Sequence, residues 1–249
     1  MTPRELRDLI RALELPSAEI LFVHLRLRGL AATESYARVS RQLLMAFQEW
    51  AAPTTILVPT FTYSFTSCRR FDRKNSPCEV GRFGEETRTH YARALRTMNP
   101  VFSCIDTAGY FTIGACDETS AFGERSLLDR LAQEGYVVVN LNLPSFVATH
   151  LHYLEYRHQV PYRFTKRFYG HISDDGEHFW PVQYAYYVRQ LTRDTRWRRE
   201  KIEGHLKARK ALHFTGYRGI RGLWVRSQSL DEIIGEALQE DPHFLITDS

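Results

Sequence analysis

Residues 136–158 read YVVVNLNLPSFVATHLHYLEYRH, and this stretch decides the fold that the rest of the chain must complete. Its β-branched beginning, residues 136–143, is typical of a buried strand. Pro144 breaks the strand, and the residues from Thr149 onward predict a helix that ends before Pro161. Because open α/β sheets usually bind ligands where a central strand gives way to the next helix, the stretch predicts an α/β fold and a site.

His152 and Glu155 stand three residues apart in the predicted helix, so their side chains share one face. A carboxylate beside an imidazole fixes its tautomer and raises its basicity, which is the arrangement of an oriented general base. The competing interpretation is a His–Glu pair on a solvated helix face, which is common at this spacing.

A metal site is a further interpretation, because His150 and His158 add two possible ligands to the same helix. On a helix His150 and His152 lie roughly 200° apart, so they cannot bind one ion from one face. The i, i+4 spacing of the H-E-x-x-H motif is also absent. We therefore expect no metal here.

The composition is that of an ordinary globular protein, with 43% hydrophobic and 25% charged residues in 249. No clean boundary is visible, so we expect one domain over residues 1–249. No apolar window approaches about 18 residues and the N-terminus lacks a signal-peptide pattern, so we expect a cytoplasmic protein without a membrane span. The net charge of +4 suits an anionic small ligand and is too small to indicate nucleic acid.

Strand and helix patterns alternate along the chain. The turn signal Asp174-Asp175-Gly176 predicts a β-hairpin over residues 167–187, within a small insertion near 165–190. Residues 60–99 are polar and aromatic, and within them residues 71–84 are loop-like, as in a long functional loop. The other predicted helices cover residues 3–14, 35–50, 85–95, 127–133, 193–210 and 230–238, and the other strands cover residues 19–24, 55–59, 101–113 and 219–225. The strands at 19–24 and 55–59 are expected to pair in parallel.

Several common catalytic motifs are missing. There is no phosphate-binding loop, dinucleotide fingerprint or nucleophile elbow, and the four cysteines (Cys68, Cys78, Cys104 and Cys116) contain no C-x-x-C pair and are expected to be free thiols. What remains is the His152 base with Arg96 and a set of hydroxyl residues, which together suit acyl or group transfer. The hydroxyl residues are Thr60, Thr62, Tyr63, Ser64, Thr97, Ser103 and Thr149.

An ordered series of segments resembles the aminoglycoside 3-N-acetyltransferase family, particularly its amino-sugar and glycan-associated members. The series covers about residues 5 to 245. Its segments are Phe22-Val23-His24, Leu57-Val58-Pro59-Thr60-Phe61-Thr62-Tyr63-Ser64-Phe65, Arg96-Thr97-x-x-Pro100-x-x-Ser103, Phe122-Gly123-x-x-Ser126, Thr149-x-Leu151-His152-x-x-Glu155, Val160-Pro161-Tyr162-Arg163 and Lys166-x-Phe168-x-Gly170.

The resemblance implies a three-layer α/β/α sandwich with a central mixed, mostly parallel sheet, and acetyl transfer from acetyl-CoA to an amino group. It implies that His152 is the base, that Glu155 orients it, and that Thr149 either donates to the oxyanion or caps the helix. We expect coenzyme contacts from His24, Thr60, Arg96, Thr97 and Ser103, with an added phosphate contact from Arg26. We expect acceptor contacts from Thr62, Tyr63, Phe65 and Asp72.

One departure from the family pattern concerns the residues after His24. Leu25-Arg26 stand where the family usually has two serines close to the acyl donor. Our first interpretation is acetylation of an amino sugar, in particular a nucleotide-linked one. Aminoglycoside acceptors are polycationic and call for an acidic cleft, whereas this mildly basic chain favours an anionic or neutral sugar. The alternatives are an aminoglycoside acetyltransferase, a relative that uses another acyl-CoA or a carrier protein, and a non-catalytic binding protein. The sequence leaves open whether the protein forms a homodimer.

Overall fold

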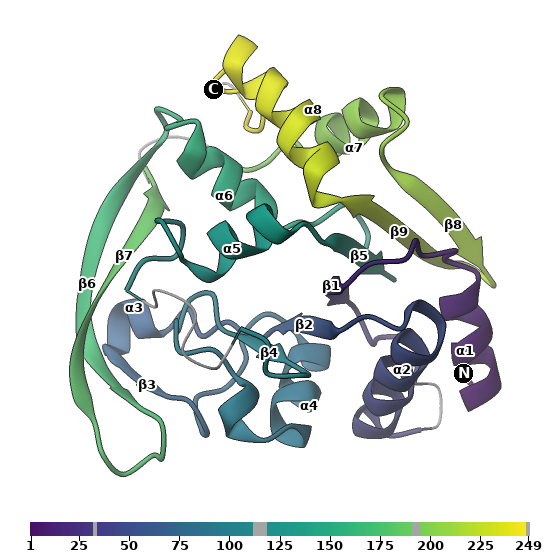
Figure 1. Ribbon diagram of the computed structural model, residues 1–249, viewed down its shortest axis with the longest axis horizontal. Coiled ribbons are helices and arrows are strands. Elements are labelled where there is room, and N and C mark those ends of the chain that lie inside the picture. The colour runs from purple at the N-terminus through teal and green to yellow at the C-terminus, as the bar shows by residue number, and fades with distance from the viewer. Residues whose placement is uncertain (32–33, 112–118, 191–194, 248–249) are drawn as a thin grey trace.

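A six-stranded mixed sheet lies between two layers of helices (Figure 1). The computed structural model describes residues 1–31, 34–111, 119–190 and 195–247, so Cys116 and the ends of the predictions at 101–113 and 193–210 lie outside the described residues. The strands, in sheet order, are β4 (Cys104–Asp106), β2 (Thr55–Pro59), β1 (Ile20–Leu25), β5 (Val137–Leu141), β9 (Ile220–Arg226) and β8 (His213–Tyr217).

Parallel pairing is confined to the centre of the sheet. β1 pairs in parallel with both β2 and β5, as the sequence predicted for β1 and β2, whereas β4, β9 and β8 join through antiparallel pairings. The sheet is therefore mixed, as expected, but less of it is parallel than expected. The reason lies partly in β8, which the sequence analysis missed: Arg218 and Gly219 both have positive φ, and this two-residue turn folds β8 back onto β9.

Each face of the sheet buries one layer of helices. Along β1, Leu21 and Val23 pack in one hydrophobic cluster and Phe22 in the other, because side chains alternate across a strand. The first layer holds α1 (Pro3–Arg11), α2 (Tyr36–Ala51) and α4 (Arg82–His90), and the second holds α5 (Leu127–Glu134), α6 (His150–Arg157), α7 (Arg199–Ala208) and α8 (Ser227–Glu240). This is the predicted three-layer α/β/α arrangement.

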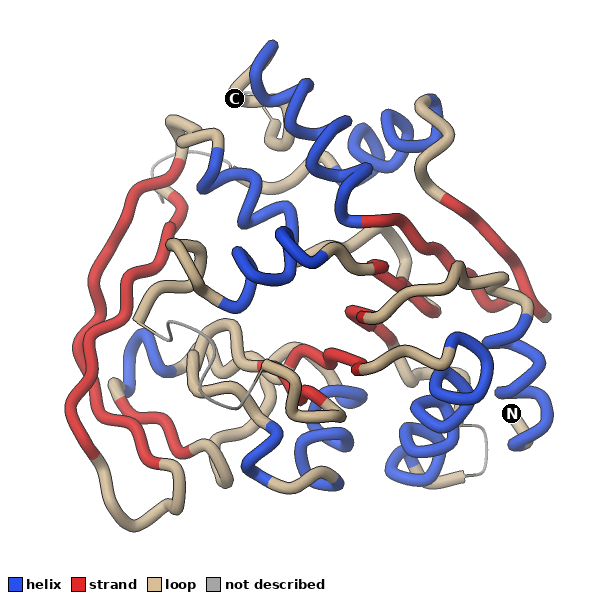
Figure 2. The backbone as a smooth tube through the Cα atoms, in the orientation of Figure 1, coloured by secondary structure: helices blue, strands red, loops and turns tan. Residues whose placement is uncertain are grey.

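A second sheet of three strands, β3 (Arg70–Asp72), β6 (Arg163–Ser173) and β7 (Trp180–Arg189), runs along one side of the molecule (Figure 2). β6 and β7 form the predicted hairpin, longer than expected, and β3 adds in parallel to β6. The end of β3 lies in the stretch 71–84 that was predicted as a loop, and the short helix α3 (Phe65–Cys68) lies in the polar, aromatic segment before it. Gly170 lets β6 approach this segment, since a Cβ there would lie 2.6 Å from the carbonyl oxygen of Arg69.

Two smaller results complete the fold. α4 ends at His90, and the chain continues to a 3₁₀ turn, η1 (Arg93–Leu95), so the predicted helix at 85–95 is shifted toward the N-terminus. Among the described residues, no helix combines the length and the apolar character that crossing a membrane requires. Cys68, Cys78 and Cys104 are free thiols, as expected.

Candidate active site

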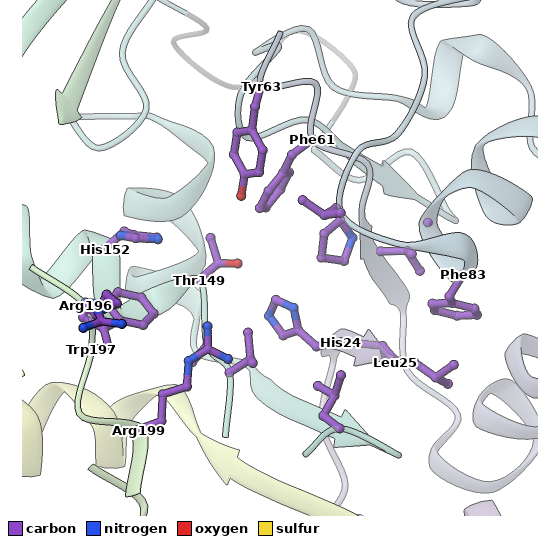
Figure 3. Close-up of a pocket in the computed structure, with 18 of the residues that line it drawn as sticks. His24, Leu25, Phe61, Tyr63, Phe83, Thr149, His152, Arg196, Trp197 and Arg199 are labelled. Carbon is purple, nitrogen blue, oxygen red and sulfur yellow. The ribbon is translucent and has the colours of Figure 1, made fainter. Parts of the chain in front are cut away.

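A cavity of about 500 Å³ opens beyond the carboxyl ends of β1 and β2, next to the start of α6 (Figure 3). This is the edge of the sheet where the sequence predicted a site. The lining residues come from β1 and β2, the segment between β2 and α4, α4, the β5–α6 connection, α6, the end of β7, and the segment that leads into α7 together with the first residue of that helix. They are Val23, His24, Leu25, Val58, Pro59, Phe61, Tyr63, Val80, Phe83, Gly84, Leu143, Val147, Ala148, Thr149, His152, Arg189, Arg196, Trp197 and Arg199.

The side chain of Asn140 holds the connection between β5 and α6 at Val147. Asn140 Nδ2 donates to the carbonyl oxygen of Val147 at 2.7 Å, and Asn140 Oδ1 accepts from the backbone N–H of Val147 at the same distance. The buried amide thus satisfies a loop that would otherwise leave polar groups unpaired. This contact fixes where α6 begins and so places Thr149 and His152 at the cavity.

His152 has the geometry of an oriented base. Its Nδ1 lies 3.0 Å from Oε2 of Glu155, within hydrogen-bond distance, and Glu155 is fully buried while His152 is 24% exposed. An ionised carboxylate at this distance favours the tautomer that carries the proton on Nδ1, and this tautomer leaves the lone pair of Nε2 for a ligand in the cavity. The predicted pairing of these two residues on one helix face is what the structure has.

Two residues that the sequence analysis did not assign hold Glu155 in turn. The Nε of Arg163, at the start of β6, lies 2.8 Å from Oε2 of Glu155 as a buried ion pair. Trp197 donates from Nε1 to Oε1 of Glu155 at 3.0 Å, and its ring packs on the His152 imidazole with centroids 4.5 Å apart. Arg163 stood in a family-like segment, and a buried arginine requires an acid, but no local pattern marks Trp197.

Burial lowers the pKa of His152 below its ordinary value of 6.5, the hydrogen bond to Glu155 opposes this, and the charges of Arg163 and Arg189 reinforce the lowering. Burial raises the pKa of Glu155, but the His152 hydrogen bond and the Arg163 charge outweigh burial, so the net pKa is lower than usual. At pH 7 the pair is therefore a neutral imidazole beside an ionised carboxylate. A neutral imidazole can accept a proton.

Thr149 and His24 face the cavity from its two sides (Figure 3). Thr149 precedes α6, yet its hydroxyl makes no capping hydrogen bond. Thr149 therefore does not cap the helix through its side chain, which was one of the two roles expected from the sequence. Burial lowers the pKa of His24 to about 3, so its ring is neutral at any working pH. Its Nε2 is buried without a hydrogen-bond partner among the described residues, which is costly unless a ligand supplies one.

Arg96 and its neighbours lie in the interior, away from the cavity lining. Arg96 is fully buried, and its guanidinium donates to the carbonyl oxygens of Thr60, Arg73 and Ser76 and to the hydroxyl of Thr62. Ser103 Oγ also donates to the carbonyl oxygen of Thr60. These residues, predicted to contact coenzyme or acceptor, connect the loops that follow β2 and precede β4.

The other residues predicted to contact coenzyme or acceptor also divide into those that line the cavity and those that do not. Tyr63 lines the cavity, as does His24. Thr97 accepts from the backbone N–H of Cys104, Phe65 is fully buried, and Asp72 accepts from the backbone of a turn. Arg26 is exposed and does not line the cavity, whereas the neighbouring Leu25 does.

His150 does not share the cavity with His152. Its ring is fully buried, with Nδ1 2.9 Å from the Tyr136 hydroxyl and Nε2 2.7 Å from Oδ1 of Asp231. Both nitrogens are thus occupied, and a metal ion shared with His152 has no ligand here. Within the described ranges, no group of three or more His, Cys, Asp or Glu side chains is placed to hold a metal.

The family profile described as aminoglycoside 3-N-acetyltransferase matches residues 22–233, a span that contains the cavity and the His152–Glu155 pair. The chain belongs to this family. Its enzymes are N-acetyltransferases that use acetyl-CoA, so the expected enzyme class and acyl donor are confirmed for the family to which the chain belongs.

Several solved structures share the fold at low sequence identity. AAC-IIIb bound to CoASH is 18% identical, with a TM-score of 0.76 over 100% of this chain and 99% of the other. AAC-VIa bound to sisomicin is 17% identical, with a TM-score of 0.73 over 96% and 98%. YokD from Bacillus subtilis is 15% identical, with a TM-score of 0.71 over 96% and 99%. A search of curated protein sequences gives no match.

Proposed function

We propose that this protein transfers the acetyl group of acetyl-CoA to an amino group of an amino-sugar acceptor, with His152 as the general base. The observation that carries the proposal is the His152–Glu155 pair, buried on one side and open to the cavity on the other. We also propose that residues 1–249 act as one acyltransferase domain with an insertion near 165–190. The β6–β7 hairpin of this insertion, which begins at Arg163, contributes Arg163 and Arg189 to the site.

The residues of the chain have separate tasks in this proposal. His152 Nε2 accepts the proton that the acceptor amine loses, and Glu155 keeps the imidazole in the tautomer that can do so. Arg163 and Trp197 hold Glu155 in place. Thr149 and His24 can donate hydrogen bonds to an oxygen that gains negative charge, a task that does not depend on pH for His24 because its ring stays neutral.

Acetyl-CoA, when bound, supplies the activated thioester. The residues present fit such a donor: the partnerless Nε2 of His24 matches a polar atom of the acyl end, and Arg196 and Arg199 at the rim can bind phosphates. Leu25, which stands in place of a family serine, gives the same end of the cavity an apolar wall. We therefore keep acetyl-CoA as the donor in spite of the missing serine pair.

Two acceptor classes follow from different observations. The family and a relative solved with sisomicin support an aminoglycoside, and they support it better than the nucleotide-linked amino sugar that was our first interpretation. The second candidate, an acidic amino sugar, is favoured by Arg189, the cavity arginine that is not assigned to the donor phosphates.

The test is thiol release from acetyl-CoA with a panel of aminoglycosides, free amino sugars and nucleotide-linked amino sugars, with the acetylated product confirmed by mass spectrometry. We expect release that requires both an acceptor and His152, and we compare wild type with His152→Ala. Release that is equal in the variant, or that produces no acetylated amine, would refute the proposal.

A further inference from the structure

The charged residues that line the cavity, among those that the structure describes, are arginines. Arg189, Arg196 and Arg199 all line it, and no Asp or Glu is among its lining residues in the part of the chain that the structure describes. A site built for a polycation places carboxylates where the ammonium groups bind, because like charges in a confined space repel each other. This lining is the opposite of what a polycationic acceptor requires.

Arg189 is the cavity arginine whose charge acts on the proposed general base, His152. It ends β7 directly opposite Arg163 on β6, the residue that holds Glu155. Its positive charge lowers the pKa of His152, and it opposes the rise that burial causes in the pKa of Tyr63. Both of those side chains line the same cavity, so Arg189 acts at the end where the acceptor amine must meet Nε2 of His152.

Arg189 also differs from the arginines that have structural roles. Arg163 pairs with Glu155, and Arg73 pairs with Asp174 at 2.9 Å. Arg199 donates to the Ser145 hydroxyl at 3.3 Å. Arg189 makes no ion pair within the described ranges of the chain, and its side chain is exposed at the cavity. Its guanidinium is available for a ligand.

We infer that the acceptor carries an anionic group, a carboxylate or a phosphate, close to its reacting amine, and that Arg189 binds this group. A guanidinium binds either anion through two parallel N–H donors, which would fix the orientation of the acceptor as well as its charge. The inference rests on the proposed function and narrows its acceptor from amino sugars in general to acidic amino sugars.

The binding of an anion at Arg189 would also make His152 a stronger base. Neutralising Arg189 removes one of the charges that lower the pKa of His152, so the imidazole becomes a stronger proton acceptor when the acceptor arrives. A polycationic acceptor would have the reverse effect. Substrate charge and base strength are thus coupled through one side chain.

The experiment compares acceptors that share an amino sugar and differ in charge: glucosamine, glucosamine 6-phosphate, UDP-glucosamine, 2-amino-2-deoxyglucuronic acid and sisomicin. Wild type is compared with Arg189→Gln, Arg189→Glu and the control Arg7→Gln, which changes an exposed arginine on α1, in the helix layer on the other face of the sheet from α6. We expect kcat/KM for at least one anionic acceptor to exceed that for glucosamine by about 10- to 100-fold, the usual value of a charged hydrogen bond.

Arg189→Gln should abolish that preference by raising the KM of the anionic acceptor, with little change in the KM of acetyl-CoA, and Arg7→Gln should leave both unchanged. Arg189→Glu should reverse the preference toward glucosamine and sisomicin. The inference is overturned if wild type prefers sisomicin, or if Arg189→Gln raises the KM of acetyl-CoA alone, which would assign Arg189 to the coenzyme phosphates.

A binding titration separates this inference from the proposed function. Calorimetry of glucosamine 6-phosphate and of 2-amino-2-deoxyglucuronic acid, without acetyl-CoA, should show binding to wild type and to Arg7→Gln and a loss of about tenfold or more in Arg189→Gln. If thiol release fails with every acceptor but this difference is seen, the proposed function fails and the anion site stands. Equal binding to all variants would remove the anion site.

Discussion

His150 and His152 stand two residues apart on α6, and each contacts a carboxylate, yet they differ in what they leave free. His150 uses Nδ1 with Tyr136 and Nε2 with Asp231 and is fully buried. His152 uses Nδ1 with Glu155 and lines the cavity. A carboxylate next to a histidine therefore does not identify a base, because a base also needs one nitrogen that is open to the substrate.

The difference follows from helix geometry. Two residues along an α-helix correspond to a rotation of about 200°, so neighbours at this spacing point to opposite sides. One side of α6 faces α8, which carries Asp231, and the other faces the cavity. The His150 network joins α6 to α8 and to the residue before β5, while the His152 network joins α6 to the hairpin through Arg163.

Removal of the His152 imidazole is the change that should separate the two histidines most. His152→Ala should lower kcat by roughly 10²–10⁴-fold, the usual contribution of a general base, with a Tm close to wild type because the side chain borders an open cavity. Steady-state thiol release and a thermal melt measure the two quantities. Full activity in a folded His152→Ala protein would show that the two histidines do not differ in the way argued above.

The orientation of His152 by Glu155 should have the second-largest effect. Glu155→Gln keeps the size of the side chain but weakens a charged hydrogen bond of about 1.5–3 kcal/mol, which corresponds to a loss of about 10- to 100-fold in kcat. Calorimetric binding of CoA should stay near wild type, since Glu155 does not line the cavity.

The same variant leaves Arg163 buried without its counter-charge, so a fall in stability is expected and rates are to be measured well below the Tm of the variant. A conservative comparison is Glu155→Asp, which keeps the charge. If Glu155→Gln lost CoA binding rather than turnover, Glu155 would belong to the binding of the donor and not to the base.

The sequence predicted the features that depend on neighbours along the chain. The β5–α6 junction and the His152–Glu155 contact arise from patterns within about twenty residues, whereas the three-layer arrangement was expected from the family resemblance. β3 could not be predicted in this way, because it pairs with β6 about one hundred residues later. The short edge strand β8 has a weak pattern of its own and depends on the turn at Arg218 and Gly219.

The site residues show the same difference between local features, which the sequence predicted, and features that depend on distant parts of the chain. Arg163 and Trp197 contact the His152–Glu155 pair, and Arg189 lines the same cavity, only because the hairpin and the segment before α7 fold against α6. Arg96 illustrates the opposite case: it stands in a family-like segment, and its buried hydrogen bonds to loop carbonyl oxygens explain why an arginine is needed there. A motif match alone does not separate a residue that holds a loop from one that contacts a ligand.

Removal of the His150 imidazole should affect stability more than catalysis. His150→Ala leaves the buried Tyr136 hydroxyl without its partner, which should lower the free energy of unfolding by about 1–3 kcal/mol. For a chain of this size each kcal/mol corresponds to about 2–4 °C in Tm. Asp231→Asn, which retains an oxygen acceptor, should cost less. A loss of kcat in folded His150→Ala as large as in His152→Ala would break the distinction between the two networks.

The pH dependence should give the smallest but most specific difference. Because burial lowers the pKa of His152 below 6.5, the base is neutral at pH 7, and kcat should fall only as the pH drops through that lowered pKa and the imidazole gains a proton. Glu155→Gln removes the contact that raises this pKa, so the acidic limb of its profile should move to lower pH. His150→Ala should leave the limb where it is in wild type, since His150 contacts neither His152 nor Glu155 through its ring nitrogens. Measurement of kcat from pH 5 to 8 for the three proteins decides the matter: a limb that shifts in His150→Ala and not in Glu155→Gln would assign the titrating base to the buried network instead.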